Sequence, residues 1–387
     1  MQFMKAMARE AVIVEAVRTP IGKRGGALKD VRPDDLAAVV FQELVDRTGI
    51  SKTLVEDVIL GCVTQIDEQG LNLARIAALV AGFPETVPGT SVNRQCASGL
   101  QAINFGAQAI MAGVHDLVIA GGVESMSRVP MGSDAGVLNQ RLLEKYEIVP
   151  QGISADYVAE KYHVTRAQMD EYSYHSHMRA IRAIDEGRFK REIVPVPVMD
   201  GEGNKRIFDT DEHPRRGTSV EKLASLPPAF KPDGNVTAGN SSGINDGASA
   251  LLLTSEEKAA ELGLTPRGRI VTMAVVGTNP TVMLEGPIPV SRMALKKAGL
   301  TVDDIDLWEI NEAFASVPLA TIQTLGLDYS KVNVNGGAIS LGHPLGCSGA
   351  RITTTLLHEL ERQKLRYGLA TLCIGFGQGV ATIIERR

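Results

Sequence analysis

Blocks of apolar residues along the chain alternate between the spacing of strands and the spacing of helices. An apolar run at 11–17 ends at the turn-forming segment 18–23, which predicts a buried strand that runs into a loop. Helical spacing follows at 33–48, and a second strand pattern occupies 55–61. The same reasoning predicts helices at 71–81 and 99–113 and a strand at 116–122. This alternation is typical of an α/β fold, in which helices cover the faces of a sheet.

The second part of the chain repeats one unit of this pattern. Residues 96–122 open with a helix start and end in a strand that finishes on glycine, and residues 346–375 do the same. Two similar halves are therefore predicted. The segment between them is richer in charge, proline and glycine turns, and structureless loops of this length are rare in compact domains. The predicted organisation is an N-terminal half at 1–122 plus 245–267, an inserted loop subdomain at 123–244, and a C-terminal half at 268–387.

Charge and hydropathy narrow the classes of partner. The 387 residues include 40 Lys and Arg and 45 Asp and Glu, so the formal net charge is −5. This balance does not support a nucleic-acid-binding surface and favours small-molecule partners. No run of 18 apolar residues occurs, and charges interrupt residues 1–10 before a signal-peptide core could form. We expect a cytoplasmic protein without membrane insertion.

Four cysteines are present, at positions 62, 96, 347 and 373. None belongs to a CxxC pair or has a histidine at ligand spacing, so no metal site is predicted. Cys96 stands at the predicted start of a helix, where unpaired N–H groups and the helix dipole favour an anion. We therefore expect the pKa of its thiol to be lowered. That position suits a reactive cysteine, although a structural cysteine at a helix start remains open.

Two further segments have the composition of chemically active loops. His343 lies between Gly342 and Pro344 in a glycine-rich stretch, which predicts an imidazole held on a loop and suited to acid or base chemistry. Residues 373–379 run from a strand into alternating glycines, and their backbone N–H groups could face a ligand oxygen. The glycine spacing there is not that of a dinucleotide-binding loop.

Taken together, these segments resemble the thiolase family from residue 11 to the C-terminus. The motifs that carry the resemblance are Arg18-Thr19-Pro20, Asn93-Arg94-x-Cys96-x-Ser98-Gly99, Gly121-Gly122-Val123-Glu124-Ser125-Met126-Ser127, Thr237-Ala238-Gly239-Asn240-Ser241-Ser242-Gly243, Asn311-Glu312-Ala313-Phe314, Gly342-His343-Pro344-x-Gly346 and Cys373-x-Gly375. The resemblance implies a duplicated α/β fold packed in five layers, α/β/α/β/α. It also implies transfer of an acyl group between a cysteine and coenzyme A.

Each catalytic requirement of that chemistry has a counterpart here by resemblance. Cys96 matches the acyl-carrying nucleophile, His343 the base that ionises it, and Cys373 the acid or base that acts at the α-carbon. Asn311 matches the residue that holds a water in one oxyanion pocket with His343. Gly375 matches the N–H donor of the other pocket, together with the N–H of Cys96. Cys62 and Cys347 match no catalytic position and are assigned to packing.

Coenzyme A is implied as a substrate, with no tightly bound cofactor. Arg215 matches a position near the nucleotide, where Arg216 could share its role, Ser242 matches a serine that bonds the pantetheine arm, and Met283 matches a pocket-lining methionine. A homodimer is expected and a tetramer is left open.

Two departures from the family pattern bear on function. Phe376 replaces the middle one of three successive glycines found in many relatives. Pro150 and Gln151 replace a His-Met pair associated with short-chain substrates. The second change favours a 3-ketoacyl-CoA thiolase of the β-oxidation type over an acetoacetyl-CoA-forming enzyme. A non-catalytic lipid-carrier or assembly subunit would not need Cys96, His343 and Cys373 together, and a ketoacyl synthase would not be expected to have the second cysteine.

Overall fold

Residues 9–387 are described by the computed structural model, so most of the segment argued to lack a signal-peptide core lies outside the described residues. One mixed sheet of ten strands forms the centre, in the order β10-β11-β12-β9-β1-β8-β5-β3-β4, with β2 beside β8. The strands of the first half are β1 (Ala11–Arg18), β2 (Gly22–Lys23), β3 (Asp57–Gly61), β4 (Gly89–Val92), β5 (Leu117–Ser125) and β8 (Asn245–Ser255). Those of the second half are β9 (Gly268–Gly277), β10 (Leu307–Ile310), β11 (Tyr367–Ile374) and β12 (Gln378–Arg386).

Four strands of each half share the same order and the same directions. In the first half β3 runs parallel to β5, β5 antiparallel to β8, and β8 antiparallel to β1. In the second half β10 runs parallel to β11, β11 antiparallel to β12, and β12 antiparallel to β9. A short antiparallel contact between β1 and β9 joins them. The predicted duplication is confirmed.

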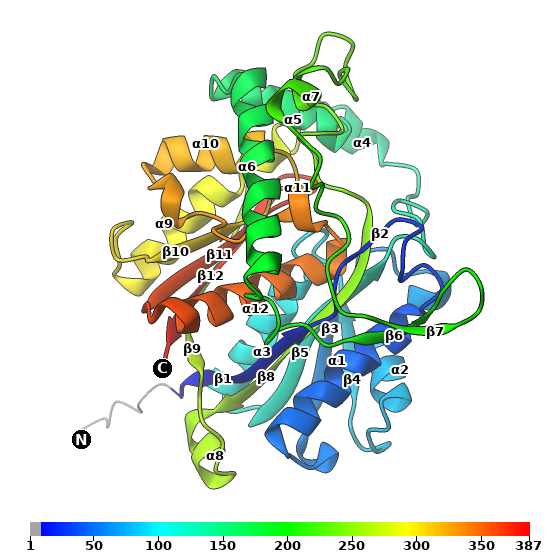
Figure 1. Cartoon of the computed structure of the whole chain (residues 1–387). Coiled ribbons are helices and arrows are strands. Elements are labelled where there is room, and N and C mark those ends of the chain that lie inside the picture. The colour runs from blue at the N-terminus through cyan, green and yellow to red at the C-terminus, as the bar shows by residue number, and fades with distance from the viewer. Residues whose placement is uncertain (1–8) are drawn as a thin grey trace, which may run out of the picture.

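Helices lie on both sides of each half-sheet (Figure 1). The middle layer is formed by α3 (Ser98–Met111) and α12 (Leu345–Gln363), which pack on each other and on strands of both halves. The outer layers contain α1 (Pro33–Thr48) and α2 (Leu73–Val80) on one side, and α9 (Pro287–Ala298) and α10 (Ser316–Leu325) on the other. The five-layer α/β/α/β/α arrangement is confirmed.

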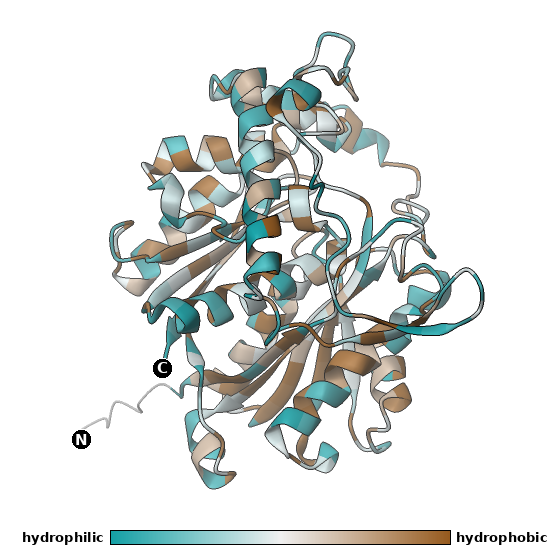
Figure 2. Ribbon diagram, viewed as in Figure 1, coloured by the Kyte–Doolittle hydropathy of each residue, from teal (hydrophilic) through white to brown (hydrophobic). Residues whose placement is uncertain are grey.

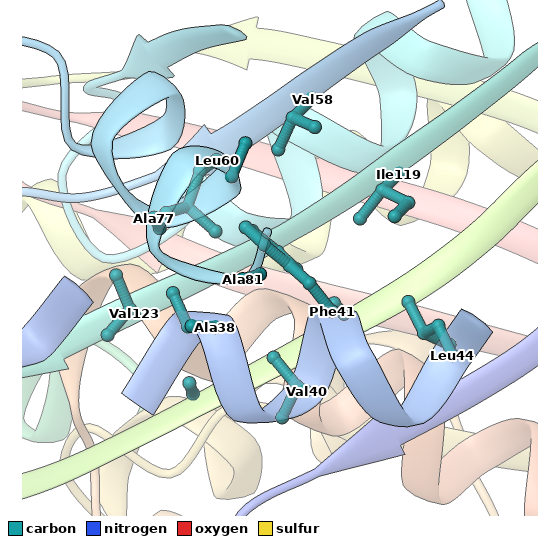
Figure 3. Close-up of a cluster of buried hydrophobic side chains, with 14 of the residues drawn as sticks. Ala38, Val40, Phe41, Leu44, Val58, Leu60, Ala77, Ala81, Ile119 and Val123 are labelled. Atoms are coloured by element: carbon teal, nitrogen blue, oxygen red, sulfur yellow. The ribbon is translucent and has the colours of Figure 1, made fainter. Parts of the chain in front are cut away.

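The core explains why the sequence forms these layers. Strand β5 is buried along its whole length and therefore shows a continuous apolar run instead of alternation. Figure 2 shows the hydrophobic residues gathered along the central strands. Helix α1 presents Leu36, Val40, Phe41 and Leu44 to the sheet, and Figure 3 shows Phe41 reaching into this cluster. Each such side chain contributes about 1.5–3 kcal/mol by leaving water.

The segment between the halves is more helical than a loop subdomain. It contains α4 (Gln140–Leu143), α5 (Gln151–Lys161), α6 (Arg166–Asp185), the hairpin β6 (Val196–Met199) and β7 (Lys205–Phe208), and α7 (Val220–Ala224). The remaining short elements are α8 (Glu256–Glu261), α11 (Ala338–Leu341), η1 (Lys52–Leu54), η2 (Asp67–Gln69), η3 (Met283–Glu285) and η4 (Tyr329–Lys331). The residue boundaries given for the three parts stay a prediction.

A buried ion-pair network fastens this segment to strand β1. Arg18 donates from Nε to Glu192 at 2.6 Å and from Nη1 to Asp211 at 2.7 Å, and all three side chains are buried. Such a cluster is strongly destabilised when one member is removed, because a charge is then left buried without a partner. The Arg18 motif therefore has a structural reason in this chain.

Candidate active site

Close backbone contact brings together the starts of the two central helices. A β-carbon on Gly99 would lie 2.6 Å from the carbonyl oxygen of Gly346, so a larger residue does not fit at position 99 without a shift of the backbone. Gly99 lies in the first turn of α3 and Gly346 in the first turn of α12. The segments that precede these helices carry Cys96 and His343, so the contact places both residues at one site.

Cys96 lies two residues before α3 and is 4% exposed. The Ser98 hydroxyl accepts from the N–H of Arg94 at 2.9 Å and donates to the carbonyl of Gln95 at 2.6 Å, which shapes the turn. Burial raises the pKa of the Cys96 thiol to about 11, and the nearby Gln151 side chain and the N–H groups of Cys96 and Gly375 oppose this rise only in part. The expected lowering of this pKa is wrong, because loss of water outweighs the donors at the helix start.

His343 occupies the loop between α11 and α12 and is 3% exposed. Its Nδ1 lies 2.5 Å from the Ser348 hydroxyl, and its Nε2 lies 3.3 Å from Nδ2 of Asn311. Burial, with the nearby Arg351 charge second, lowers the pKa of His343 to about 3. The ring is therefore neutral at pH 7.

The hydrogen bonds of His343 select one tautomer. Ser348 donates its only hydroxyl proton to the carbonyl of Pro344 at 2.9 Å, so its oxygen accepts from Nδ1–H of His343. The unprotonated Nε2 then accepts from the Asn311 amide. This is the form of imidazole that can take a proton from a thiol.

Cys373 lies near the end of β11, opposite Gly379 of β12, and is 1% exposed. It packs with Met283 and Phe314 in one buried hydrophobic cluster. Burial, followed by the effect of Cys96, raises the pKa of the Cys373 thiol well above its ordinary value. The side chain is thus held as a thiol, which is the acid form.

The turn after β11 carries Gly375, whose N–H lies near enough to Cys96 to favour its thiolate. Phe376 and Gly377 follow with φ angles of 60° and 77°, in the left-handed region that suits Gly377 and strains Phe376. The Phe376 ring is 45% exposed and lies on the wall of the cavity described next. Replacing the family's middle glycine therefore leaves the turn intact and adds an aromatic ring to the site.

A cavity of about 1130 Å³ opens onto this site. Cys96, His343, Arg215 and Ser242 line it, so four of the predicted residues meet at one space. Cys373, Asn311 and Gly375 are not among the lining residues, although Asn311 contacts His343 and both Cys373 and Gly375 lie near enough to Cys96 for their pKa values to be linked to it. The apolar part of the wall includes Met126, Met131, Leu138, Phe230, Phe314 and Leu345.

The residues proposed for coenzyme A divide into two groups. The N–H of Arg215 donates to Nδ1 of His177 at 3.1 Å, and the N–H of Ser242 donates to the carbonyl of Ala313 at 2.9 Å, so both residues are held at the cavity wall. Met283, expected on the wall, instead lies behind it because η3 packs into the cluster around Cys373. Arg216 pairs with Asp185 and does not line the cavity.

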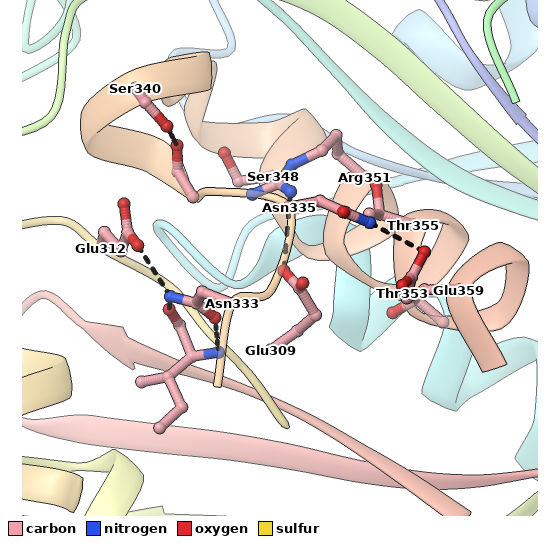
Figure 4. Close-up of polar contacts among 12 residues, drawn as sticks. Glu309, Glu312, Asn333, Asn335, Ser340, Ser348, Arg351, Thr353, Thr355 and Glu359 are labelled. Atoms are coloured by element: carbon pink, nitrogen blue, oxygen red, sulfur yellow. Dashed lines mark hydrogen bonds and ion pairs between the residues drawn. The ribbon is translucent and has the colours of Figure 1, made fainter. Parts of the chain in front are cut away.

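Glu312 organises the segment that carries Asn311 (Figure 4). Its buried carboxylate accepts from Tyr172, Ser176 and Asn333 at 2.7–2.9 Å and from the N–H of Ile339 at 3.1 Å. These partners come from α6, α11 and the loop before it. The network therefore fixes Asn311 relative to His343.

Sequence reasoning missed several residues of the site. Ser348, Gln95 and Gln151 take part in its geometry without having been proposed as functional. Ser348 lies in the first turn of α12, close enough in sequence to His343 to have been considered. Cys62 and Cys347, assigned to packing, are fully buried.

Comparison with known proteins agrees with this geometry. Residues 11–257 match the model of the thiolase N-terminal domain and residues 264–386 that of the thiolase C-terminal domain. The chain is 49% identical over 383 residues to a 3-ketoacyl-CoA thiolase of Yersinia pestis, covering 97% of this chain and 99% of the relative. It is 48% identical over 401 residues to a β-ketoadipyl-CoA thiolase of Pseudomonas aeruginosa, covering 98% and 100%. The crystal structure of a Bacillus anthracis acetyl-CoA acetyltransferase superposes with a TM-score of 0.92 at 46% identity, covering 98% of this chain and 99% of that one. The chain therefore belongs to the thiolase family of acyltransferases.

Proposed function

We propose that this protein is a 3-ketoacyl-CoA thiolase that works in the degradative direction, as in β-oxidation of fatty acids. It transfers an acyl group to CoA through an acyl-cysteine and releases acetyl-CoA. The observation that carries the proposal is the placement of Cys96 and neutral His343 on one cavity.

The first step forms the acyl-enzyme. The Cys96 proton passes to Nε2 of His343, and the sulfur attacks the 3-keto carbonyl carbon of the substrate. The bond between C2 and C3 then breaks, and its electron pair goes to C2, conjugated with the thioester carbonyl. The Cys373 thiol gives its proton to C2, which releases acetyl-CoA and leaves an acyl group on Cys96. The raised pKa of Cys373 supports its role as the acid.

The second step transfers the acyl group to CoA. The incoming CoA thiol gives its proton to the Cys373 thiolate, and its sulfur attacks the acyl carbon. Cys96 leaves as a thiolate and recovers its proton from His343, so the enzyme returns to its starting state. Two sets of donors would stabilise the charge that develops on oxygen. One is His343 together with a water held by Asn311, and the other is the pair of N–H groups of Cys96 and Gly375.

CoA is proposed as a substrate that binds along the cavity, and no tightly bound cofactor is needed for these steps. Arg215 would face its phosphate or adenine end, and Ser242 would bond the pantetheine arm. We propose that Met283 packs behind the cavity wall and holds that part of the wall in place.

An acetoacetyl-CoA-forming acetyltransferase is the second candidate, favoured by the likeness to the Bacillus anthracis enzyme. The cavity of about 1130 Å³, with its apolar wall, has room for acyl chains longer than acetyl and supports the first candidate. A non-catalytic carrier or assembly role is disfavoured because the chain has Cys96, His343 and Cys373 together, and Cys96 and His343 line one cavity.

A cleavage assay tests the proposal. Purified protein is given CoA and a series of 3-ketoacyl-CoA substrates of increasing chain length, and loss of the 3-keto thioester is followed. We expect cleavage of substrates with six or more carbons in addition to the four-carbon substrate, and no cleavage by Cys96→Ala. Activity on the four-carbon substrate alone would establish the second candidate in place of the first.

We further propose a homodimer in the cytoplasm. Strand β4 ends the sheet and offers an unpaired edge, and Leu71, before α2, is 97% exposed. No helix among residues 9–387 combines the length and hydropathy that crossing a bilayer requires. Light scattering coupled to gel filtration measures the mass of the particle in solution. We expect the mass of a dimer, and we expect Leu71→Asp to weaken that dimer. A monomer mass at all protein concentrations would refute the proposed homodimer.

A further inference from the structure

Asn245 is the first residue of β8, and its side chain is fully buried. Its Oδ1 accepts from the backbone N–H of His343 at 3.0 Å, and its Nδ2 donates to the carbonyl of Gly22 at 3.0 Å. A donor on one side and an acceptor on the other allow only one orientation of the amide. Asn245 therefore links a strand of the first half directly to the main chain at His343.

The residue before His343 is shaped to meet this carboxamide. Gly342 has a φ angle of 105°, in the region that favours glycine. A β-carbon on Gly342 would lie 2.4 Å from Cγ of Asn245, so the backbone of the loop packs directly on the amide. The buried N–H of His343 needs a hydrogen-bond partner there, because an unpaired one is costly. Asn245 supplies that partner at the point of closest approach.

A second buried side chain of the first half holds the other end of the same segment. Glu124 of β5 accepts from the N–H of Gly346 at 2.9 Å. Glu124 lies opposite Gly247 in the ladder between β5 and β8, and Gly247 is two residues after Asn245. Glu124 and Asn245 therefore stand on one face of the sheet. Residues 343–346 are fastened at both ends to that face.

The His343 ring has contacts of a different origin from those of its main chain. The ring nitrogens contact Ser348 and Asn311, which belong to the second half. Cys96 precedes α3 and belongs to the first half. The bond from Asn245 joins the main chain of His343 to the half that carries Cys96. The position of the imidazole relative to the thiol therefore depends on this bond.

We propose that Asn245 is a positioning residue, which holds the backbone of His343 so that Nε2 of the ring stays within reach of the Cys96 proton. The proposal rests on the proposed function, in which Cys96 gives its proton to His343. Asn245 is not among the residues that line the cavity, so it acts through His343 and not on the substrate. Proton transfer needs a close and aligned base, so a shift of this loop slows the formation of the thiolate.

The test is alkylation of Cys96, which needs no acyl-CoA. The full chain is treated with iodoacetamide at pH 7.5, and modification of the peptide that contains Cys96 is followed by mass spectrometry. The thiolate is the form that reacts. Asn245→Leu has a similar size and removes the acceptor for the N–H of His343. We expect it to slow alkylation about tenfold.

A double variant separates positioning from a general loosening of the fold. His343→Ala removes the base, and Asn245 then has no imidazole to place. We expect Asn245→Leu to change the alkylation rate by less than about twofold in this background. A tenfold slowing that persists without His343 would overturn the proposal, because the side chain would then act by another route.

Asn104 offers a matched control. It is also fully buried, and it accepts from the Thr382 hydroxyl at 2.7 Å, which is a bond between the two halves. Asn104→Leu loses a buried bond of the same kind away from His343 and should leave the alkylation rate unchanged. Equal slowing in Asn104→Leu would overturn the proposal, because loss of any buried bond between the halves would then suffice.

A smaller substitution keeps the test valid if Asn245→Leu does not fold. Asn245→Ala removes the same acceptor without adding apolar volume, and we expect it to slow alkylation by a similar factor. Circular dichroism checks the fold of each variant. The alkylation rate of the unmodified protein in a folded Asn245→Leu or Asn245→Ala variant overturns the proposal.

The two proposals fail in different ways. If the unmodified protein cleaves no 3-ketoacyl-CoA, but Asn245→Leu slows alkylation only when His343 is present, the proposed substrate is wrong and the positioning role holds. If cleavage is observed and Asn245→Leu does not slow alkylation, the positioning role alone is wrong.

Discussion

Arg94 donates from Nη1 to Oε1 of Gln378 at 2.9 Å. Arg94 lies two residues before Cys96, and Gln378 is the first residue of β12, three residues after Gly375. The bond therefore ties the segment that carries Cys96 to the turn that contains Gly375. The bond links the two halves of the chain beside the candidate active site.

Removing this tie should slow catalysis more than it weakens substrate binding. In Gln378→Leu the guanidinium loses its acceptor, and the Gly375 turn is free to shift relative to Cys96. A misplacement of about 1 Å at a reacting centre costs up to about 100-fold in rate. We expect kcat for 3-ketoacyl-CoA cleavage to fall 10- to 100-fold with KM for CoA nearly unchanged. Arg94→Met combined with Gln378→Leu should lose no more than the single variants; fully additive losses would show that the pair does not act as a unit.

Ser348 should control which nitrogen of His343 carries the proton. In Ser348→Ala, Nδ1–H loses its acceptor, and the ring is free to adopt the tautomer with a proton on Nε2, which cannot accept one from Cys96. We expect kcat/KM to fall about 100-fold, within the range of a lost general base. Steady-state kinetics measures this, with Ser330→Ala at an exposed turn as the control. Unchanged kinetics would show that Ser348 does not control the tautomer of His343.

Buried neutral histidines should make the fold sensitive to acid. Burial, with Arg267 second, lowers the pKa of His358 to about 3, against about 6.5 in an unfolded chain. Between these values the unfolded state binds a proton that the folded state does not, so stability falls as pH falls from 6.5 toward 3. The slope is about 1.4 kcal/mol per pH unit for one such group.

Urea unfolding at pH 5, 6 and 7 measures this effect. His358→Gln keeps a donor for the carbonyl of Ala16, which His358 Nε2 contacts at 2.9 Å, and should reduce the acid slope by about 1.4 kcal/mol per pH unit. Equal slopes in His358→Gln and the unmodified protein would contradict the prediction.

Two neighbouring arginines offer a matched test of CoA binding. Arg215 lines the cavity, whereas Arg216 pairs with Asp185 outside it. We expect Arg215→Ala to raise KM for CoA about tenfold with kcat little changed, because a charged contact to the nucleotide end binds substrate and transition state alike. Arg216→Ala should leave KM within about twofold. The reverse pattern would transfer the proposed role to Arg216.

Much of the fold was readable along the chain because it depends on local pattern. The strands at 11–18 and 117–125 and the helix at 33–48 follow from apolar runs and helical spacing, and the repeat of helix start and glycine-ended strand revealed the duplication. The boundaries of the inserted segment carry no such periodic signal. Its helices α5 and α6 have only a weak apolar face, so the sequence pattern does not distinguish them clearly from loops.

The sequence by itself determined which residue types were available for the chemistry and where in the repeated units they stand. Cys96, His343 and Cys373 were named from their motifs alone. Their charge states were decided by the tertiary structure: Cys96 lies just before a helix, yet its thiol has a raised pKa because the fold buries it. The close approach of Gln151 to Gly375 also needed the fold, because helix position is a local property, whereas access to water and distance between side chains depend on segments that are remote along the chain.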